Sequence, residues 1–426
     1  MTDHTSNSKS KLILFFHKFN SIYHILNEYI DLKNLWMANK DLWNSNEHIL
    51  LCYLTLNESI SKEYIKSEEY RRYIHSKVLN PNKQISIKLF CNYDIKDVSS
   101  LANVHTLSLR QCRDIKDVSM LGNIHTLNLS GCDKITDVSS LGKVHTLNLS
   151  FCGRIRDVSM LGNVHTLDLS YCDQIIDVSA LKNVHTLYLY ECKRLTDVSC
   201  LGKVHTLNLS RCNGITDVNS LGNVYDLNLY RSCQISDVSF LGNVHTLNLS
   251  WCQGITDVSH LGYVHTLNLS NCSGITDVSH LGYVHTLNLS YCQGIRNVSA
   301  LGNVNTLKLR ACNKITDVSM LGKVHILDLS GCDGITDVSS LGNVHDLDLS
   351  DCDGIADISR LGNVHTLNLS ECCHITDVSM LGNVHTLYLE NCYSIIDVSA
   401  LGNVKHLHYS LYEYNYESEY DSYEFD

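Results

Sequence analysis

Residues 121–140 read LGNIHTLNLSGCDKITDVSS, and the next 20 residues read LGKVHTLNLSFCGRIRDVSM. The same register holds from Leu101 to Ala400 without an insertion or a deletion, which gives 15 full copies. A degenerate copy at about 81–100 precedes them and a truncated copy follows. Because a period of this length is the signature of a repeat protein, the 20-residue unit decides the fold.

Seven positions of the unit are consistently apolar. With Leu101 as position 1, they are positions 1, 4, 7, 9, 12, 15 and 18. This spacing fits neither a helix nor a uniform alternation, so each copy is predicted to form one coil of a solenoid. The leucines at positions 7 and 9 predict a short strand, H-T-L-x-L-S, and stacked copies predict a parallel sheet. Gly at position 2 is expected to supply a turn that needs no Cβ.

The segment V-H-T-L-x-L-S-x-C-x-x-I resembles the leucine-rich-repeat signature L-x-x-L-x-L-x-x-N/C-x-L over residues 81–410. The I-T-D-V-S-x-L end is similar to internalin-type repeats, and the cysteine is similar to the one in repeats of F-box proteins. Short, near-identical repeats of amoebal and giant-virus proteins also look similar. The resemblance implies a right-handed solenoid with a parallel β-sheet on its concave face. A 20-residue coil has no room for a full helix, so short 3₁₀ or extended segments and a shallow curvature are expected.

The N-terminal region differs from the repeats. Residues 1–10 are expected to be flexible, and residues 11–80 have no 20-residue period. Helix-like apolar spacing in SIYHILNEYIDLKNLWMANKDLWNS predicts a small α-helical domain. This stretch resembles an F-box, which docks on the adaptor of cullin ubiquitin ligases, and the matching residues are Ile25, Leu26, Ile30, Leu32, Leu35 and Trp43. The alternative is a helical cap over the apolar edge of the first coil.

Composition excludes several classes of protein. A content of 44% hydrophobic and 18% charged residues excludes disorder, and no apolar run is long enough to cross a membrane. The first residues lack a cleavage site for a signal peptide, so an intracellular location, cytoplasmic or in the cytoplasm of a viral host, is expected. Reduced thiols are expected there. The net charge of −12 argues against a nucleic-acid partner.

Three polar positions are nearly invariant among the 15 copies. Position 12 is Cys in 14 copies, position 5 is His in 13, and position 17 is Asp in 14. A line of parallel thiols does not offer zinc four converging ligands, so buried core thiols are predicted. The imidazoles are expected to hydrogen-bond a neighbour or the backbone and to remain mostly neutral at pH 7. The carboxylates are expected to accept backbone N–H bonds in a turn.

Catalytic motifs are missing from the sequence. It contains no nucleophile elbow, P-loop or H-E-x-x-H, and identical copies would multiply any catalytic residue fifteenfold. No enzymatic activity, cofactor or metal site is therefore expected. A metal-binding or redox protein that uses the His and Cys columns is the least favoured alternative.

Positions 6, 8, 10 and 11 flank the inward leucines and are predicted to face outward from the concave sheet. Position 11 varies most, and the middle copies place aromatic and arginine side chains there or beside it, the types that dominate interface hot spots. Neutral drift at an exposed position would explain the same variation. The candidate partner-binding residues are Phe151, Tyr171, Tyr188, Tyr190, Arg211, Tyr230, Arg231, Trp251 and Tyr291.

Negative charge is concentrated at the C-terminal end. Residues 321–426 contain 3 basic and 18 acidic residues, so the remainder of the chain is slightly basic. Such a region could steer a basic partner, although solvation of a solenoid end explains it equally. The candidate acidic patch consists of Asp328, Asp346, Asp348, Asp351 and Asp353. Residues 411–426, LYEYNYESEYDSYEFD, are expected to form a flexible acidic tail.

The sequence thus favours a non-catalytic scaffold that binds a protein partner through the concave face of its repeats. The alternative is an F-box-type substrate receptor of a cullin ubiquitin ligase, in which residues 19–45 recruit the adaptor and the repeats hold the target. Neither hypothesis involves a membrane or a nucleic acid.

Overall fold

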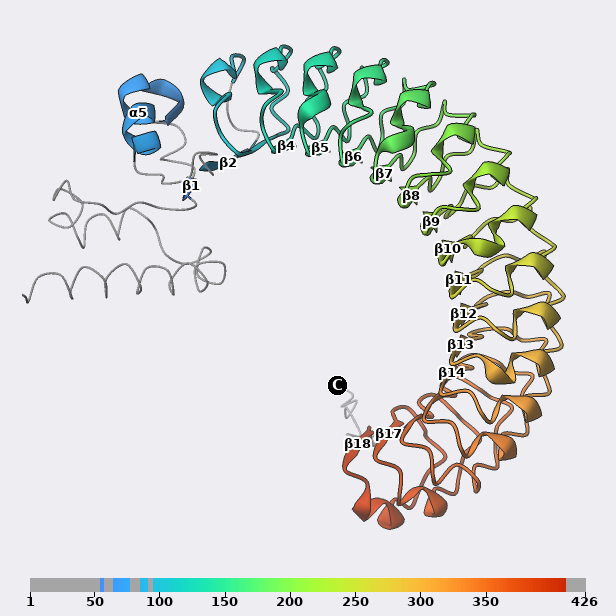
Figure 1. The fold of residues 1–426 in the computed structure, drawn as a ribbon. Helices are drawn as coiled ribbons and strands as arrows, with labels where there is room; N and C mark the ends of the chain where they lie inside the picture. Colours follow the sequence, from blue (N-terminus) through green and yellow to red (C-terminus); the bar gives the residue numbers. More distant parts are fainter. Residues whose placement is uncertain (1–53, 57–63, 77–84, 91–94, 411–426) are drawn as a thin grey trace, which may run out of the picture.

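The described residues form a solenoid with one parallel sheet along its inner side (Figure 1). The structure, a computed structural model, describes residues 54–56, 64–76, 85–90 and 95–410. Within them, 18 strands follow one another across the sheet in chain order. From β3 onward the register advances by one repeat per strand, as where Leu127 lies opposite Leu147. The solenoid predicted from the 20-residue period is confirmed.

Each regular coil contributes one strand, and nearly all contribute one short 3₁₀ helix. The N-terminal elements are β1 (Leu54–Leu56), α5 (Glu68–Ser76) and β2 (Ile85–Phe90). The remaining strands are β3 (Thr106–Arg110), β4 (Thr126–Asn128), β5 (Thr146–Asn148), β6 (Thr166–Asp168), β7 (Thr186–Tyr188), β8 (Thr206–Asn208), β9 (Asp226–Asn228), β10 (Thr246–Asn248), β11 (Thr266–Asn268), β12 (Thr286–Asn288), β13 (Thr306–Lys308), β14 (Ile326–Asp328), β15 (Asp346–Asp348), β16 (Thr366–Asn368), β17 (Thr386–Leu389) and β18 (His406–Tyr409). The 3₁₀ helices are η1 (Ser99–Leu101), η2 (Ser119–Leu121), η3 (Ser139–Lys143), η4 (Ser159–Leu161), η5 (Ser179–Asn183), η6 (Ser199–Leu201), η7 (Asn219–Leu221), η8 (Ser239–Asn243), η9 (Ser259–Leu261), η10 (Ser279–Leu281), η11 (Ser299–Asn303), η12 (Ser319–Leu321), η13 (Ser339–Leu341), η14 (Ser379–Leu381) and η15 (Ser399–Asn403).

The core is built from the seven apolar positions of the repeat. In the coil that contains β10, all seven side chains are at most 3% exposed. They are Leu241, Val244, Leu247, Leu249, Cys252, Ile255 and Val258. The same columns are buried in nearly every described coil, which confirms the core predicted from the sequence.

Most strands are shorter than the six residues that the sequence predicts. They cover positions 6–8 only, as in β4. The backbone N–H of Leu129 still donates to the carbonyl oxygen of Asn148 at 2.8 Å, but the N–H of Ser130 donates to the side-chain Oδ1 of Asn128 at 2.9 Å. The asparagine at position 8 therefore forms a local turn where the strand ends.

Glycine at position 2 allows a close contact between coils. Its backbone is ordinary, with a φ of −65° at Gly122. A Cβ on Gly122 would lie 2.2 Å from the carbonyl oxygen of Ser140 in the next coil. The special turn conformation expected from the sequence is thus not the reason for this glycine. Ala102 and Lys182 take its place in two coils.

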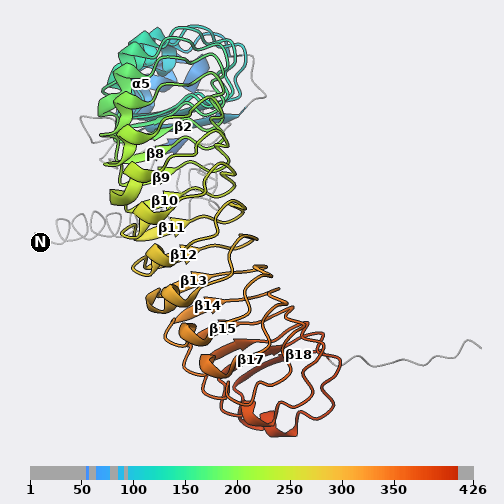
Figure 2. The same cartoon turned by 90° about the vertical axis from the view of Figure 1, so that its right-hand side faces the viewer.

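The solenoid curves more strongly than the sequence suggests. Figure 1 shows a pronounced arc with strands inside and 3₁₀ turns outside, and in Figure 2 the strands from β8 to β17 follow a slanted row. The expected shallow curvature is wrong. Hydrogen bonds hold neighbouring strands about 4.8 Å apart on the inner side of the solenoid. A 3₁₀ turn is wider than an extended strand, so neighbouring coils lie farther apart on the outer side and the solenoid curves.

The sheet begins earlier than residue 81. Strand β1 pairs in parallel with β2, Leu54 lying opposite Ile85. Helix α5 and strand β1 both lie within residues 11–80, for which a helical domain is expected. Tyr64, just before α5, is fully buried in the solenoid core, and Arg71 Nη1 donates to its carbonyl oxygen at 2.9 Å.

Several expectations fall outside the described residues. They are the flexible N-terminus at 1–10, the F-box candidates Ile25, Leu26, Ile30, Leu32, Leu35 and Trp43, and the tail at 411–426. The part of the N-terminal region that is described, residues 64–76 with β1, lies at the start of the solenoid as a cap would.

Candidate protein-binding face

Position 11, which follows each strand, has a left-handed backbone. In all 15 coils its φ lies between 53° and 73°, and 13 of these residues are not glycine. The conformation costs a residue with a Cβ about 1–2 kcal/mol, less for Asn or Asp. The backbone ladder nevertheless continues here, since the N–H of Gly131 donates to the carbonyl oxygen of Ser150 at 2.8 Å. The sequence signal for this conformation, not recognised in the sequence analysis, is the presence of Gly131, Asn271 and Gly331 at position 11.

Most of the candidate partner-binding side chains contact a neighbour, and together they follow consecutive coils. The ring of Phe151 stacks on that of Tyr171 with 4.2 Å between centroids. Tyr171 in turn meets the edge of Tyr190 at 5.1 Å. The side-chain hydrogen bond with Tyr190 is the main cause that raises the pKa of Tyr171 to about 12.

Two arginines belong to the same group. The Cζ atom of Arg211 lies 5.9 Å from the Tyr190 ring. Arg231 Cζ lies 5.9 Å from the Tyr230 ring and 4.7 Å from that of Trp251. We call this group the aromatic–arginine row. It consists of Phe151, Tyr171, Tyr190, Arg211, Tyr230, Arg231 and Trp251.

Two candidates stand apart from the row. Tyr188 lies on β7 at position 8, between Asp168 and Asn208 of the adjacent strands. Tyr291 is 43% exposed at position 11, two coils beyond Trp251. Within the described residues, neither makes a ring contact with the row.

The five aspartates of the candidate acidic patch gather on two adjacent coils. Asp328 and Asp348 are direct neighbours across β14 and β15, and Asp346 lies on β15 as well. Asp328 Oδ1 accepts the backbone N–H of Ser330 at 3.0 Å, as asparagine does at position 8 in other coils. Asp351 and Asp353 follow in the next turn and are exposed. Aspartate in place of asparagine at position 8 keeps this turn bond and adds negative charge beside the sheet.

The cysteine column is a buried ladder of thiols. Cys132 Sγ donates to the carbonyl oxygen of Leu109 in the preceding coil at 3.1 Å, and the same bond recurs along the solenoid. Where the sequence has Ser232 at position 12, its Oγ donates to Leu209 at 3.0 Å, so the hydroxyl replaces the thiol. Burial raises the pKa of Cys132 to about 12. The prediction of core thiols is confirmed.

We expect thiol reactivity to separate the ladder from the surface cysteines. The thiolate is the reactive form, and burial both raises the pKa and blocks access in the ladder. Among the described cysteines, Cys233 and Cys373 are exposed. Brief treatment of the native protein with iodoacetamide, followed by peptide mass spectrometry, should label these two first. Equal labelling of Cys252 in the native state would contradict a packed ladder.

The histidine column forms a stack along one side of the strands. His125 and His145 lie 4.6 Å apart with ring planes within 10°, and Tyr225 continues the stack, which breaks at Asn305. His145 Nδ1 lies 3.2 Å from the hydroxyl of Thr146, so the expected neighbour bond is present. Desolvation first, and then the adjacent imidazoles, lowers the pKa of His145.

The aspartate column caps the turn before each 3₁₀ helix. Asp257 Oδ1 accepts the backbone N–H of Ser259 at 2.9 Å, which is the bond expected from the sequence. Bonding to Ser259 lowers the pKa of Asp257. Asn297 makes the same bond to Ser299 at 2.9 Å.

A convex-side cluster was missed by the sequence analysis. Consecutive coils place Phe240, His260, Tyr263, His280 and Tyr283 around a shallow hollow of about 750 Å³. Tyr263 and Tyr283 stack with 6.2 Å between their centroids and are largely exposed. The sequence signal was that neighbouring copies carry tyrosine at position 3 and phenylalanine or histidine at position 20, where the other copies have different residues.

Comparison with known proteins agrees with this geometry. The family description "Leucine Rich repeat" matches residues 243–259, which span the end of η8, all of β10 and the start of η9. The chain is a leucine-rich-repeat solenoid. No curated protein sequence matches it.

Two of the similar solved structures support the fold with TM-scores above 0.5. A leucine-rich-repeat protein of Leptospira interrogans has a TM-score of 0.56 at 19% identity, with 78% of this chain and 97% of that chain covered. TLR13 in its complex with ssRNA13 has a TM-score of 0.54 at 21% identity, with 76% and 56% covered. The internalin inlF of Listeria monocytogenes has a TM-score of 0.42 at 22% identity, with 75% and 90% covered.

Among the described residues of this solenoid, no helix is long and apolar enough to cross a membrane.

Proposed function

We propose that this leucine-rich-repeat solenoid is a non-catalytic intracellular scaffold that binds a protein partner through the aromatic–arginine row. The observation that carries the proposal is the exposure of contacting aromatic and arginine side chains at positions 10 and 11. Phe151 and Trp251 have left-handed backbones with φ of 61° and 64°, yet their side chains remain 54% and 39% exposed. The same backbone occurs at position 11 of all 15 coils, so the repeat imposes it. What distinguishes Phe151 and Trp251 is a large aromatic side chain that this chain leaves exposed, which is typical of an interaction site.

The chemistry of the row fits a protein interface. Trp, Tyr and Arg are enriched at hot spots because they combine a large apolar surface with a polar group. The contacts of Arg231 with Tyr230 and Trp251 hold the planar groups in place before a partner arrives. Less side-chain entropy is then lost on binding. The acidic patch lies several coils away and would orient a partner that carries basic residues.

A role as F-box-type receptor would add an adaptor to the same scaffold. It depends on Leu26, Trp43 and their neighbours, which lie outside the described residues. The repeats would hold a target in either case, so the proposal rests on the row alone.

The test is a triple replacement that restores residues found at the same positions of other copies. Tyr190→Ser, Arg231→Gly and Trp251→Gly remove three members of the row. Glycine also relieves the left-handed backbone at the last two positions, so we expect unchanged or higher thermal stability. Affinity capture with the intact chain, compared by quantitative mass spectrometry, should lose its specific partner with this variant.

The matched control removes two aromatic rings from the convex side. Tyr263→Ala and Tyr283→Ala change exposed rings of the same kind without touching the concave face. Capture should survive in this control. If the triple variant retains the partner, the variation at position 11 is drift and the proposal fails.

A further inference from the structure

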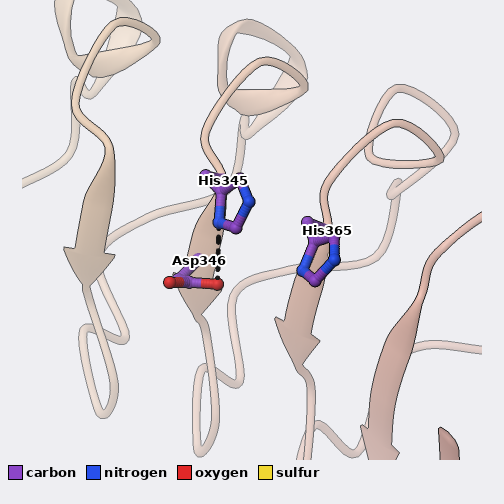
Figure 3. Close-up of side chains that lie close together, drawn as sticks. All are labelled: His345, Asp346 and His365. Atoms are coloured by element: carbon purple, nitrogen blue, oxygen red, sulfur yellow. Dashed lines mark hydrogen bonds and ion pairs between the residues drawn. The ribbon is translucent and has the colours of Figure 1, made fainter.

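One coil of the histidine column carries an additional ligand group. Most copies place Thr after the column histidine, but Asp346 follows His345. Figure 3 shows both residues at the start of β15, with His365 at the start of β16 beside them. His345 Nδ1 lies 3.1 Å from Asp346 Oδ1.

The three side chains converge closely enough to share one ion. Each offers an atom, and the three atoms lie within 4.8 Å of one another. A zinc ion binds imidazole nitrogen at about 2.0–2.1 Å and carboxylate oxygen at about 2.0–2.2 Å, so its ligands lie up to about 4 Å apart. The rings of His345 and His365 are stacked with 4.5 Å between centroids and must rotate to direct both nitrogens at an ion. His345 and Asp346 are partly exposed, which leaves room for that rotation.

We propose that His345, Asp346 and His365 bind a divalent cation of the zinc class. Two imidazoles and one carboxylate suit such a cation, and water from the exposed side would complete its coordination. A metal on His345 Nδ1 would replace the hydrogen bond to Asp346, with the proton of the neutral imidazole then on Nε2 by exchange with solvent. Asp348 on the same strand and Asp328 beside it add negative potential that favours a cation.

The site is specific to this coil. The coil before it places Ile326 after His325, and the coil after it places Thr366 after His365. Asp226 is also at position 6, but it follows Tyr225 and not a histidine. Within the described residues, only this group brings three such ligands together.

Zinc titration of the full chain tests the proposal. The protein is made without a polyhistidine tag, stripped with a chelator, and titrated with Zn²⁺ against a chromophoric competitor. We expect one tight site per chain. Asp346→Thr introduces the residue most common at this position, so the fold should persist, as circular dichroism can verify. Its zinc affinity should fall by at least the roughly 10–100-fold that is typical when a residue hydrogen-bonded to a metal ligand is lost.

Two further variants decide where the ion binds. His365→Asn, which copies the natural break at Asn305, should weaken binding as Asp346→Thr does. Asp226→Thr changes the same repeat position beside Tyr225 and should leave the tight site intact. The proposal is overturned by an unchanged affinity in Asp346→Thr, by an equal loss in Asp226→Thr, or by many weak sites without a tight one.

Discussion

Replacing Leu247 by alanine should lower the free energy of unfolding by about 2–5 kcal/mol, the range for removing a fully buried leucine. Leu247 is 1% exposed on β10, and it packs in register between Leu227 and Leu267. In a solenoid each coil is stabilised mainly by its two neighbours. A cavity at this position therefore weakens both interfaces of a central coil and divides the array into two halves. Urea unfolding followed by circular dichroism measures the loss.

The control is the same substitution at the same repeat position in the last coil. Leu407 on β18 is only half-buried and pairs with Leu387 on one side. Leu407→Ala should therefore cost about 1 kcal/mol or less. Equal losses at Leu247 and Leu407 would contradict a stability that depends on neighbours on both sides. A broadened transition in Leu247→Ala would show that the two halves unfold separately.

The period of the sequence was sufficient to locate the core, because a column that is apolar in every copy can only face inward. Strand length and curvature depend on features that apolar spacing does not report. The strand ends where Asn128 captures the N–H of Ser130, and this bond is between a side chain and the backbone. Curvature arises from the difference in width between strand and 3₁₀ turn. Apolar spacing reports neither the side-chain bond nor the difference in width.

The candidate site was recognised in part for the same reason. Variation at position 11 identified Phe151 and Tyr171, and their stacking follows from a separation of 20 residues. The contact of Tyr171 with Tyr190 runs diagonally, between positions 11 and 10, and a comparison by columns does not predict it. The pair of His345 and Asp346 was overlooked as a ligand group because the consensus of the 15 copies does not show a change that occurs in one copy only.

Acidification should destabilise the solenoid in two steps, first near the pKa of histidine and then near that of aspartate. The pKa of His125, His145 and His185 is lowered in the folded protein, chiefly by desolvation. The unfolded chain then takes up protons first, below about pH 6.5. The stability from the neutral imidazoles is therefore complete above that pH and is lost as the pH falls toward their folded pKa.

The aspartate column acts in the same direction at lower pH. Bonding to the following serine lowers the pKa of Asp257 and Asp277 in the fold. Their contribution is complete above the unfolded value of about 3.9 and is lost as the pH falls through the lower folded value. Many equivalent groups titrate together in this repeat, so small individual effects add up.

Variants that copy natural exceptions to each column test the two steps separately. His125→Asn, His145→Asn and His185→Asn introduce the residue that Asn305 provides naturally, and they should reduce the loss of Tm between pH 7 and 5. Asp257→Asn and Asp277→Asn retain the turn bond that Asn297 makes and should reduce the loss below pH 4 only. The measured quantity is the difference in Tm between wild type and variant at each pH, which cancels the titration of all other groups. A difference that does not change with pH would show that the columns contribute nothing to acid sensitivity, and that stacking and turn formation are independent of protonation.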